Sequence, residues 1–131
     1  MGAQGRRKRI LVIEDNGALS KMLDRWLTFN GFDVRIEATG QAALSCAVDY
    51  KPDLVILDLR LPDISGYDVC HGLRQQFSPW ELPIVMLTGM DRPVDQLRGF
   101  AHGADAYLIK PFDTAELLKI LAILMGEPAS R

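Results

Sequence analysis

The chain has 131 residues, enough for one domain with a single buried core. Hydrophobic residues make up 48% and charged residues 24%, proportions that exclude a disordered or fibrous chain. The net charge of -2 gives no general attraction to nucleic acid or to a membrane surface. The apolar runs are strand-sized and far shorter than the roughly 20 residues of a membrane helix, so no span is predicted.

A basic run, Arg6 to Arg9, precedes the apolar run Ile10 to Ile13 and looks like the start of a signal peptide. Glu14 and Asp15 end that apolar run after four residues, which is too short for a signal sequence. We therefore expect a cytoplasmic protein. Residues 1–8 are interpreted as a solvated basic flank, because no aromatic or second basic stretch supports a nucleic-acid patch.

Five short aliphatic or β-branched runs, bounded by Gly, Pro or Asp, have the length and composition of strands. They are Ile10–Ile13, Asp33–Ile36, Leu54–Leu57, Ile84–Leu87 and Ala106–Ile109. The third and fourth runs are continuously apolar, as expected for strands that are covered on both faces.

Helical patterns lie between these runs. The first has an apolar stripe and stops at Gly31; the stripe consists of Leu19, Met22, Leu23, Trp26 and Leu27. The others are predicted at 41–49, at 67–76, at 93–102, and from Asp113 or Thr114 up to Gly126. Cys46 and Cys70 fall inside helical patterns without a CxxC spacing, so free and partly buried thiols are predicted.

This alternation predicts an α/β fold, a parallel sheet with helices on both faces, because right-handed crossovers place each helix over the sheet. For five strands we expect the flavodoxin-like doubly wound order 2-1-3-4-5, in a single domain spanning 1–131 with a tail or linker at 126–131. In this fold the ligand crevice lies at the carboxyl ends of the strands, where the first and third strands diverge.

Polar residues follow four of the strands at this edge. Glu14 and Asp15 follow the first strand, Asp58 the third, Thr88 the fourth and Lys110 the fifth. Neighbouring carboxylates raise one another's pKa unless a cation is present, so the cluster predicts a hard, oxygen-binding metal such as Mg²⁺. The Lys110 ammonium and the Thr88 hydroxyl suit a phosphoryl group beside it. Asp58, in the middle, is the candidate nucleophile for an acyl phosphate.

Taken together, these motifs resemble the receiver domain of two-component response regulators over roughly residues 8–125. The matching pieces are the acidic pair in VIEDN, the DLRLPDISG segment, LTG with its hydroxyl, and GADAYLIKPF with its lysine and proline. The resemblance implies a phosphorylation-dependent signalling switch that takes a phosphoryl group from a histidine kinase or phosphotransfer protein. It implies a regulatory domain that catalyses only its own phosphorylation and dephosphorylation, not an enzyme with a separate substrate.

The resemblance also implies a role for each site residue. Asp58 corresponds to the phosphoacceptor, Asp15 to a direct Mg²⁺ ligand and Glu14 to a ligand acting through water. The backbone carbonyl of Arg60 corresponds to the third protein ligand of the metal. Arg60 and Met90 occupy positions that vary in this family and tune the lifetime of the phosphoryl group.

Thr88 and Lys110 resemble the pair that binds the phosphoryl group, and Tyr107 the aromatic residue that swings inward when the threonine shifts. The resemblance further implies a cis peptide bond between Lys110 and Pro111. The helix at 93–102 is the expected movable element, because Gly99 costs about 1 kcal/mol relative to Ala in a helix.

The last helix carries more apolar residues than one sheet-facing stripe can take up, so Leu118, Ile123 or Met125 should be exposed and mark a partner site. We expect phosphorylation to change the surface formed by the helix at 93–102, the strand at 106–109 and this last helix. That change would control an output domain or partner, or a homodimer. No direct nucleic-acid or membrane binding is expected of this domain.

Three other classes of protein share parts of this pattern. A flavodoxin would have a Ser/Thr/Gly-rich loop after the first strand, where EDNGALS presents anions. A dehalogenase-type phosphatase needs a second aspartate two residues after the nucleophile, where this chain has Arg60. A receiver-like interaction module that works without phosphorylation would normally lack one of the five site residues, and none is missing. Only GEPASR follows Met125, so a stand-alone receiver and a piece of a longer protein both stay open.

Overall fold

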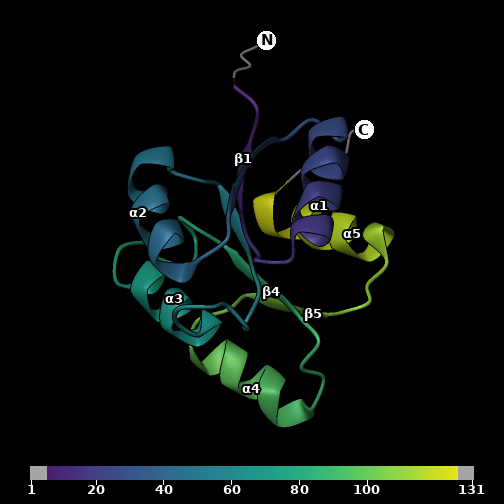
Figure 1. Ribbon diagram of the computed structural model, residues 1–131. Helices are drawn as coiled ribbons and strands as arrows, with labels where there is room; N and C mark the ends of the chain where they lie inside the picture. Colours follow the sequence, from purple (N-terminus) through teal and green to yellow (C-terminus); the bar gives the residue numbers. More distant parts are fainter. Residues whose placement is uncertain (1–5, 127–131) are drawn as a thin grey trace.

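The computed structural model describes residues 6–126, which form five strands and five helices in alternation (Figure 1). The strands are β1 (Arg9–Ile13), β2 (Asp33–Glu37), β3 (Leu54–Leu57), β4 (Ile84–Thr88) and β5 (Ala106–Ile109). The helices are α1 (Gly17–Phe29), α2 (Gly40–Tyr50), α3 (Gly66–Arg74), α4 (Pro93–Ala101) and α5 (Thr114–Met125). Most of the predicted basic flank, 1–8, and of the predicted tail, 126–131, lies outside the described residues. The assignment of 1–131 to a single domain with this flank and tail stays a prediction.

The strands form one parallel sheet in the order β2-β1-β3-β4-β5, which confirms the predicted topology. In the register of β1, Ile13 lies beside Glu37 of β2 and Leu57 of β3. The carboxyl ends of the central strands therefore meet at one edge. Helices α1 and α5 cover one face of the sheet, and α2, α3 and α4 lie on the other (Figure 1).

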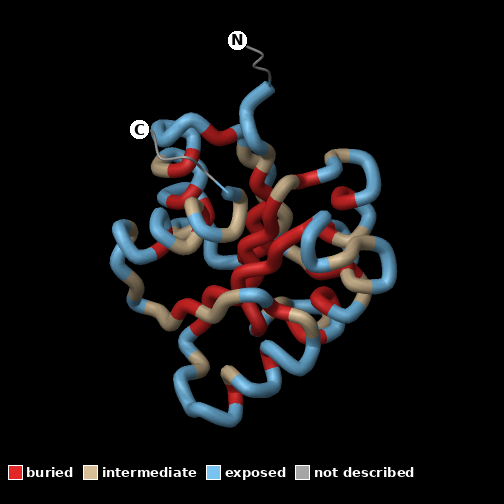
Figure 2. The backbone as a smooth tube through the Cα atoms, turned by 180° about the vertical axis from the view of Figure 1, so that it is seen from behind, coloured by how far each residue is buried: buried red, intermediate tan, exposed pale blue. Residues whose placement is uncertain are grey.

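Each face of the sheet carries its own hydrophobic core. In β1, Ile10 and Val12 pack with α1 and α5, whereas Leu11 and Ile13 pack with α2 and α3. The alternation follows from the two-residue period of a strand. Because both faces are covered, every residue of β3 and β4 is buried, and the central strands form the red centre of Figure 2.

Local sequence sets where the helices begin. The side chain of Asn16 accepts a hydrogen bond from the Leu19 N–H at 3.0 Å, and Asp113 accepts one from Ala115 at 2.9 Å. Such caps satisfy N–H groups that have no partner within the helix. Helix α4 differs, because its first turn is held by Asp95, which accepts a bond from the Arg92 N–H at 3.2 Å.

The exposure of individual side chains confirms some predictions and contradicts one. Leu118 and Ile123 of α5 are exposed, as expected, and both cysteines are free and buried. Met22 was wrongly placed on the inner stripe of α1, since its side chain is exposed beside the buried Leu23. Within residues 6–126, none of the helices has the length and apolar character needed to span a membrane. The cytoplasmic location stays a prediction.

Candidate functional site

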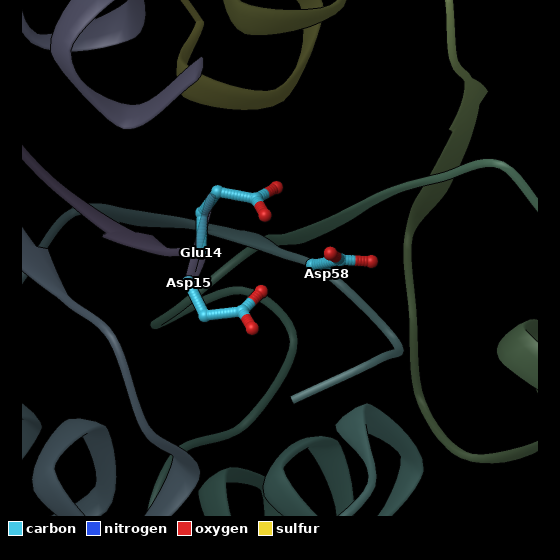
Figure 3. A group of neighbouring side chains, drawn as sticks. All are labelled: Glu14, Asp15 and Asp58. Atoms are coloured by element: carbon cyan, nitrogen blue, oxygen red, sulfur yellow. The ribbon is translucent and has the colours of Figure 1, made fainter. Parts of the chain in front are cut away.

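Three carboxylates gather where β1 and β3 end (Figure 3). One carboxylate oxygen from each of Glu14, Asp15 and Asp58 lies within 4.8 Å of the other two. The register explains this proximity, because Ile13 pairs with Leu57 and the next residues of the two neighbouring strands leave the sheet together. Glu14 is 3% exposed and Asp58 is 6% exposed, whereas Asp15 is exposed.

Lys110, from the end of β5, reaches this cluster. Its Nζ lies 2.8 Å from Glu14 Oε1 and 3.2 Å from Asp58 Oδ2, so one ammonium joins two nearly buried carboxylates. The backbone N–H of Lys110 donates to the carbonyl of Thr88 at 2.9 Å. The peptide bond between Lys110 and Pro111 is cis, as expected.

The electrostatics of this cluster follow from its burial. Loss of hydration raises the pKa of Glu14, and the bond from Lys110 only partly opposes that change. Burial alone would lower the pKa of Lys110. The hydrogen bonds and negative charges of Glu14 and Asp58 outweigh the effect of burial, so the pKa of Lys110 is raised. The lysine therefore stays charged at neutral pH. Three carboxylates face one ammonium, which leaves the site short of positive charge.

The donor atoms at the site fit Mg²⁺. This ion takes hard oxygen ligands and usually keeps several waters, and Asp15 lies on the solvent side of the cluster, where waters have access. The loop after β3 turns back over the Asp58 carboxylate, because the Arg60 N–H donates to Asp58 Oδ1 at 3.2 Å. Glu14, Asp15 and Asp58 are thus brought together as predicted, and the Arg60 backbone adjoins them.

The predicted switch residues lie on the neighbouring strands. Thr88, buried at the end of β4, accepts a weak hydrogen bond at its hydroxyl from the Met90 N–H at 3.4 Å. The hydroxyl of Tyr107 donates to the Met90 carbonyl at 2.7 Å. Burial raises the pKa of Tyr107 to about 12, so this hydroxyl keeps its proton. Thr88 and Tyr107 thus bind the same loop between β4 and α4.

Three contacts near the site were not predicted from the sequence. Both carboxylate oxygens of Asp63 accept bonds from the N-terminus of α2. The hydroxyl of Tyr67, in α3, donates to the Asp95 carbonyl of α4 at 3.3 Å. Asp95 is itself nearly fully buried. An aspartate after a proline indicates only a turn, so no signal in the sequence pointed from Asp63 to α2.

Comparison with known proteins identifies the family. Residues 10–122 match the family model of the response regulator receiver domain. The chain belongs to this family. It is 41% identical over 121 residues to the response regulator ArlR of Staphylococcus aureus, covering 92% of this chain and 54% of that protein. It is 39% identical over 117 residues to the DNA-binding dual master transcriptional regulator RpaA of Synechocystis sp.. That match covers 89% of this chain and 48% of RpaA.

The receiver domain therefore spans about half the length of these curated relatives. Solved structures match it over nearly their whole length. The receiver domain of Klebsiella pneumoniae RstA, in a BeF3-activated form, is 31% identical with a TM-score of 0.85, covering 90% of this chain and 98% of that one. A CheY-like receiver domain protein from Methanospirillum hungatei is 28% identical with a TM-score of 0.85, and the match covers 92% of this chain and 95% of that one.

These matches confirm the fold class and the family inferred from the sequence motifs. A receiver domain of a response regulator is a regulatory domain. The family and the acidic cluster together agree with a phosphorylation-dependent signalling switch.

Proposed function

We propose that this receiver domain accepts one phosphoryl group on Asp58 and thereby switches a surface that includes α4. The observation that carries the proposal is the position of Lys110, whose ammonium lies within hydrogen-bonding distance of Asp58 in a cluster of three carboxylates. A nucleophilic carboxylate beside a fixed cation is suited to phosphoryl transfer, which depends mainly on positioning and on charge stabilisation.

The transfer begins when a carboxylate oxygen of Asp58 attacks the phosphorus of the donor. The new O–P bond forms as the bond to the leaving group breaks, and the leaving group departs with that electron pair. In a phosphohistidine donor the broken bond is P–N, and in acetyl phosphate it is P–O. The Lys110 ammonium and the Thr88 hydroxyl interact with the phosphoryl oxygens, and the domain thus promotes its own phosphorylation.

Glu14, Asp15 and Asp58, with the Arg60 carbonyl, would hold Mg²⁺ at this site. When bound, Mg²⁺ neutralises charge on the phosphoryl oxygens. Asp15 is the better placed for direct binding, because it is exposed and has no ion pair among residues 6–126. Glu14 is already bonded to Lys110, which favours a role through water.

The phosphoryl group carries about -1.5 to -2 charges, in place of the single charge of a carboxylate, and it brings new acceptor oxygens to the end of β3. These oxygens attract Thr88 and Lys110. A shift of Thr88 acts on Met90 through their hydrogen bond, and Met90 is bonded in turn to Tyr107. The Tyr107 ring packs beside Gly99 of α4, so the change reaches this helix.

The partners proposed for this domain are a histidine kinase or phosphotransfer protein as donor, and an output partner or a second copy at the face made by α4, β5 and α5. Exposed apolar side chains support this face, including Leu97 and Phe100 on α4 and Leu118 on α5. RpaA is named as a DNA-binding regulator, and in this protein we assign any such output to a region other than the receiver domain.

Labelling with acetyl phosphate and Mg²⁺ tests the acceptor. One phosphoryl group should attach to the wild-type protein, with the lability to hydroxylamine of an acyl phosphate, and Asp58→Asn should abolish it. Asp49→Asn, an exposed aspartate on α2, is the matched control and should label normally. Undiminished labelling of Asp58→Asn would refute the assignment. A wild-type protein that takes no label would favour the module that works without phosphorylation.

A further inference from the structure

The loop that joins the acceptor to α3 is closed tightly at its base. The Gly66 N–H donates to the Leu59 carbonyl at 2.9 Å, and the Arg60 N–H donates to Asp58 Oδ1. A Cβ atom at Gly66 would lie 2.5 Å from the Asp58 carbonyl oxygen and 2.7 Å from Leu59 Cα. The two ends of the loop therefore pack backbone to backbone beside the acceptor.

The tip of the same loop is attached to a different helix. Asp63 Oδ1 accepts a hydrogen bond from the Gly40 N–H and Oδ2 accepts one from the Gln41 N–H, both at 2.8 Å. These donors belong to the first turn of α2, where N–H groups have no partner within the helix. The two bonds lower the pKa of Asp63, so it is ionised at neutral pH, and its charge is favourably placed at a helix N-terminus.

Ile64 adds an apolar contact beside these bonds. A Cβ atom at Gly40 would lie 2.5 Å from Ile64 Cγ1 and 2.7 Å from Val69 Cγ2. The absence of a side chain at Gly40 thus makes room for Ile64, which packs against the core shared by α2 and α3. The loop tip is held both by charge and by shape.

We infer that Asp63 is a positioning residue for the phosphoacceptor site, acting by fixing the tip of the loop to α2 so that the Arg60 backbone stays against Asp58. The inference rests on the proposed function, because it concerns the same carboxylates. Asp63 touches no reacting atom. Its effect is conformational, since a loop held only at its base would have to be ordered each time the metal or the phosphoryl group binds.

Thr39 offers a matched control for this inference. Its hydroxyl caps the same helix, accepting from the Ala42 N–H at 3.2 Å, but it belongs to the segment before α2 and not to the acceptor loop. Asp63→Ala and Thr39→Ala therefore both remove a cap of α2, and only Asp63→Ala releases the loop. Asp63→Asn keeps the shape and one acceptor oxygen, and provides a milder variant should the alanine variant fold poorly.

Mg²⁺ affinity, measured by titration calorimetry on the whole chain, should fall about 10-fold in Asp63→Ala, as is typical when a supporting residue of a metal site is removed. Asp63→Asn should lie between Asp63→Ala and the wild type, and Thr39→Ala should bind like the wild type although its melting temperature falls. Hydrogen exchange of the Arg60 and Gly66 amides, without metal, should be faster in Asp63→Ala than in the wild type, intermediate in Asp63→Asn and unchanged in Thr39→Ala.

Equal losses of Mg²⁺ affinity in Asp63→Ala and Thr39→Ala, or unchanged exchange at Arg60 and Gly66, would reduce Asp63 to a helix cap and overturn the inference. A wild-type protein without Mg²⁺ binding would count against the proposed function instead. The exchange measurement needs no metal and would still decide the role of Asp63.

Discussion

Helices α3 and α4 have the same length of nine residues and neighbour each other, yet they are held in different ways. Helix α3 buries four hydrophobic side chains between the sheet and its neighbours, namely Tyr67, Val69, Cys70 and Leu73. Helix α4 buries only Asp95 and Gly99 and turns apolar side chains outward, so the lower end of the molecule in Figure 2 is mostly pale blue. Burial of apolar surface fixes α3, and it contributes little to α4.

Polar contacts take the place of a core under α4. The Tyr67 hydroxyl of α3 donates to the Asp95 carbonyl, and the Arg98 guanidinium lies 4.8 Å above the Tyr67 ring. Within α4 itself, the Arg92 guanidinium pairs with the Asp95 carboxylate at 3.0 Å and holds the first turn. The Cys70 thiol donates to the carbonyl of His102 at 3.1 Å. A typical hydrogen bond contributes about 1 kcal/mol, whereas a buried leucine contributes about 2 kcal/mol or more. Displacing α4 should therefore cost less free energy than displacing α3.

The largest difference between the two helices should appear on truncating one leucine in each. Leu73 of α3 is fully buried, and Leu73→Ala should lower the free energy of unfolding by about 3 kcal/mol through lost contacts and a cavity. Leu97 of α4 is 68% exposed, and Leu97→Ala should change the free energy by less than about 0.5 kcal/mol. Urea unfolding measures both, and similar losses would show that α4 is packed as firmly as α3.

The contrast also shows what the sequence could predict. The five strands followed from periodicity, and their order was chosen as the common doubly wound order for five strands. The gathering of Glu14, Asp15, Asp58 and Lys110 followed from one rule, that residues after parallel strands meet at one edge. That rule depends only on positions along the chain. The ends of the helices were predicted to within a few residues for a similar reason, since caps and stops are local.

Contacts between loops and helices could not be predicted in this way. The bond from Asp63 to α2 and the burial of Asp95 depend on how separate segments pack, which no local pattern encodes. Gly99 was interpreted as a weak point in its helix. The structure adds a packing reason, because a Cβ atom there would lie 2.9 Å from Met86 Sδ and 3.1 Å from the Tyr107 ring.

A smaller effect is expected from Tyr67→Phe, which removes the hydrogen bond to the Asp95 carbonyl and leaves the ring in place. The free energy of unfolding should fall by about 1 kcal/mol. Amide hydrogen exchange should become faster in α4 and stay unchanged in α3, because only α4 loses an attachment.

Tyr50→Phe is the control for this change. The hydroxyl of Tyr50 is buried without a hydrogen-bond partner among residues 6–126, so its removal should be neutral or slightly stabilising. If both variants lost the same stability, the bond between Tyr67 and Asp95 would not be what holds α4.

Gly99→Ala should change the free energy of unfolding by less than about 1 kcal/mol, because the gain in helix propensity opposes the crowding against Met86 and Tyr107. The methyl group should nevertheless displace the Tyr107 ring, which NMR detects as changed ring chemical shifts. Gly72→Ala is the control on α3. Its Cβ atom would meet Leu44 at 3.0 Å, and the Tyr107 signals should stay unchanged. Unaltered Tyr107 shifts in Gly99→Ala would contradict the close packing of α4 on β5.

The smallest effect concerns acid. The hydrogen bond and charge of Arg92 hold the pKa of Asp95 below its usual range. The pKa of such a carboxyl is lower in the folded protein than in the unfolded chain, where it is about 3.9. The carboxyl contributes its full stabilisation of the folded state at a pH above the unfolded pKa. It loses that contribution as the pH falls through the folded pKa. Amide protection factors in α4 should therefore decrease below about pH 4 before those in α3 do.

Arg92→Gln separates Asp95 from the other acidic groups that titrate in this range. Without the guanidinium, the pKa of Asp95 should rise, and α4 should loosen at a higher pH than in the wild type, while the response of α3 stays where it was. The pKa can be followed directly from the carboxyl carbon shift of Asp95. Loss of protection in α3 and α4 at the same pH, in both proteins, would mean that acid unfolds the domain as one unit and that the ion pair does not hold α4 separately.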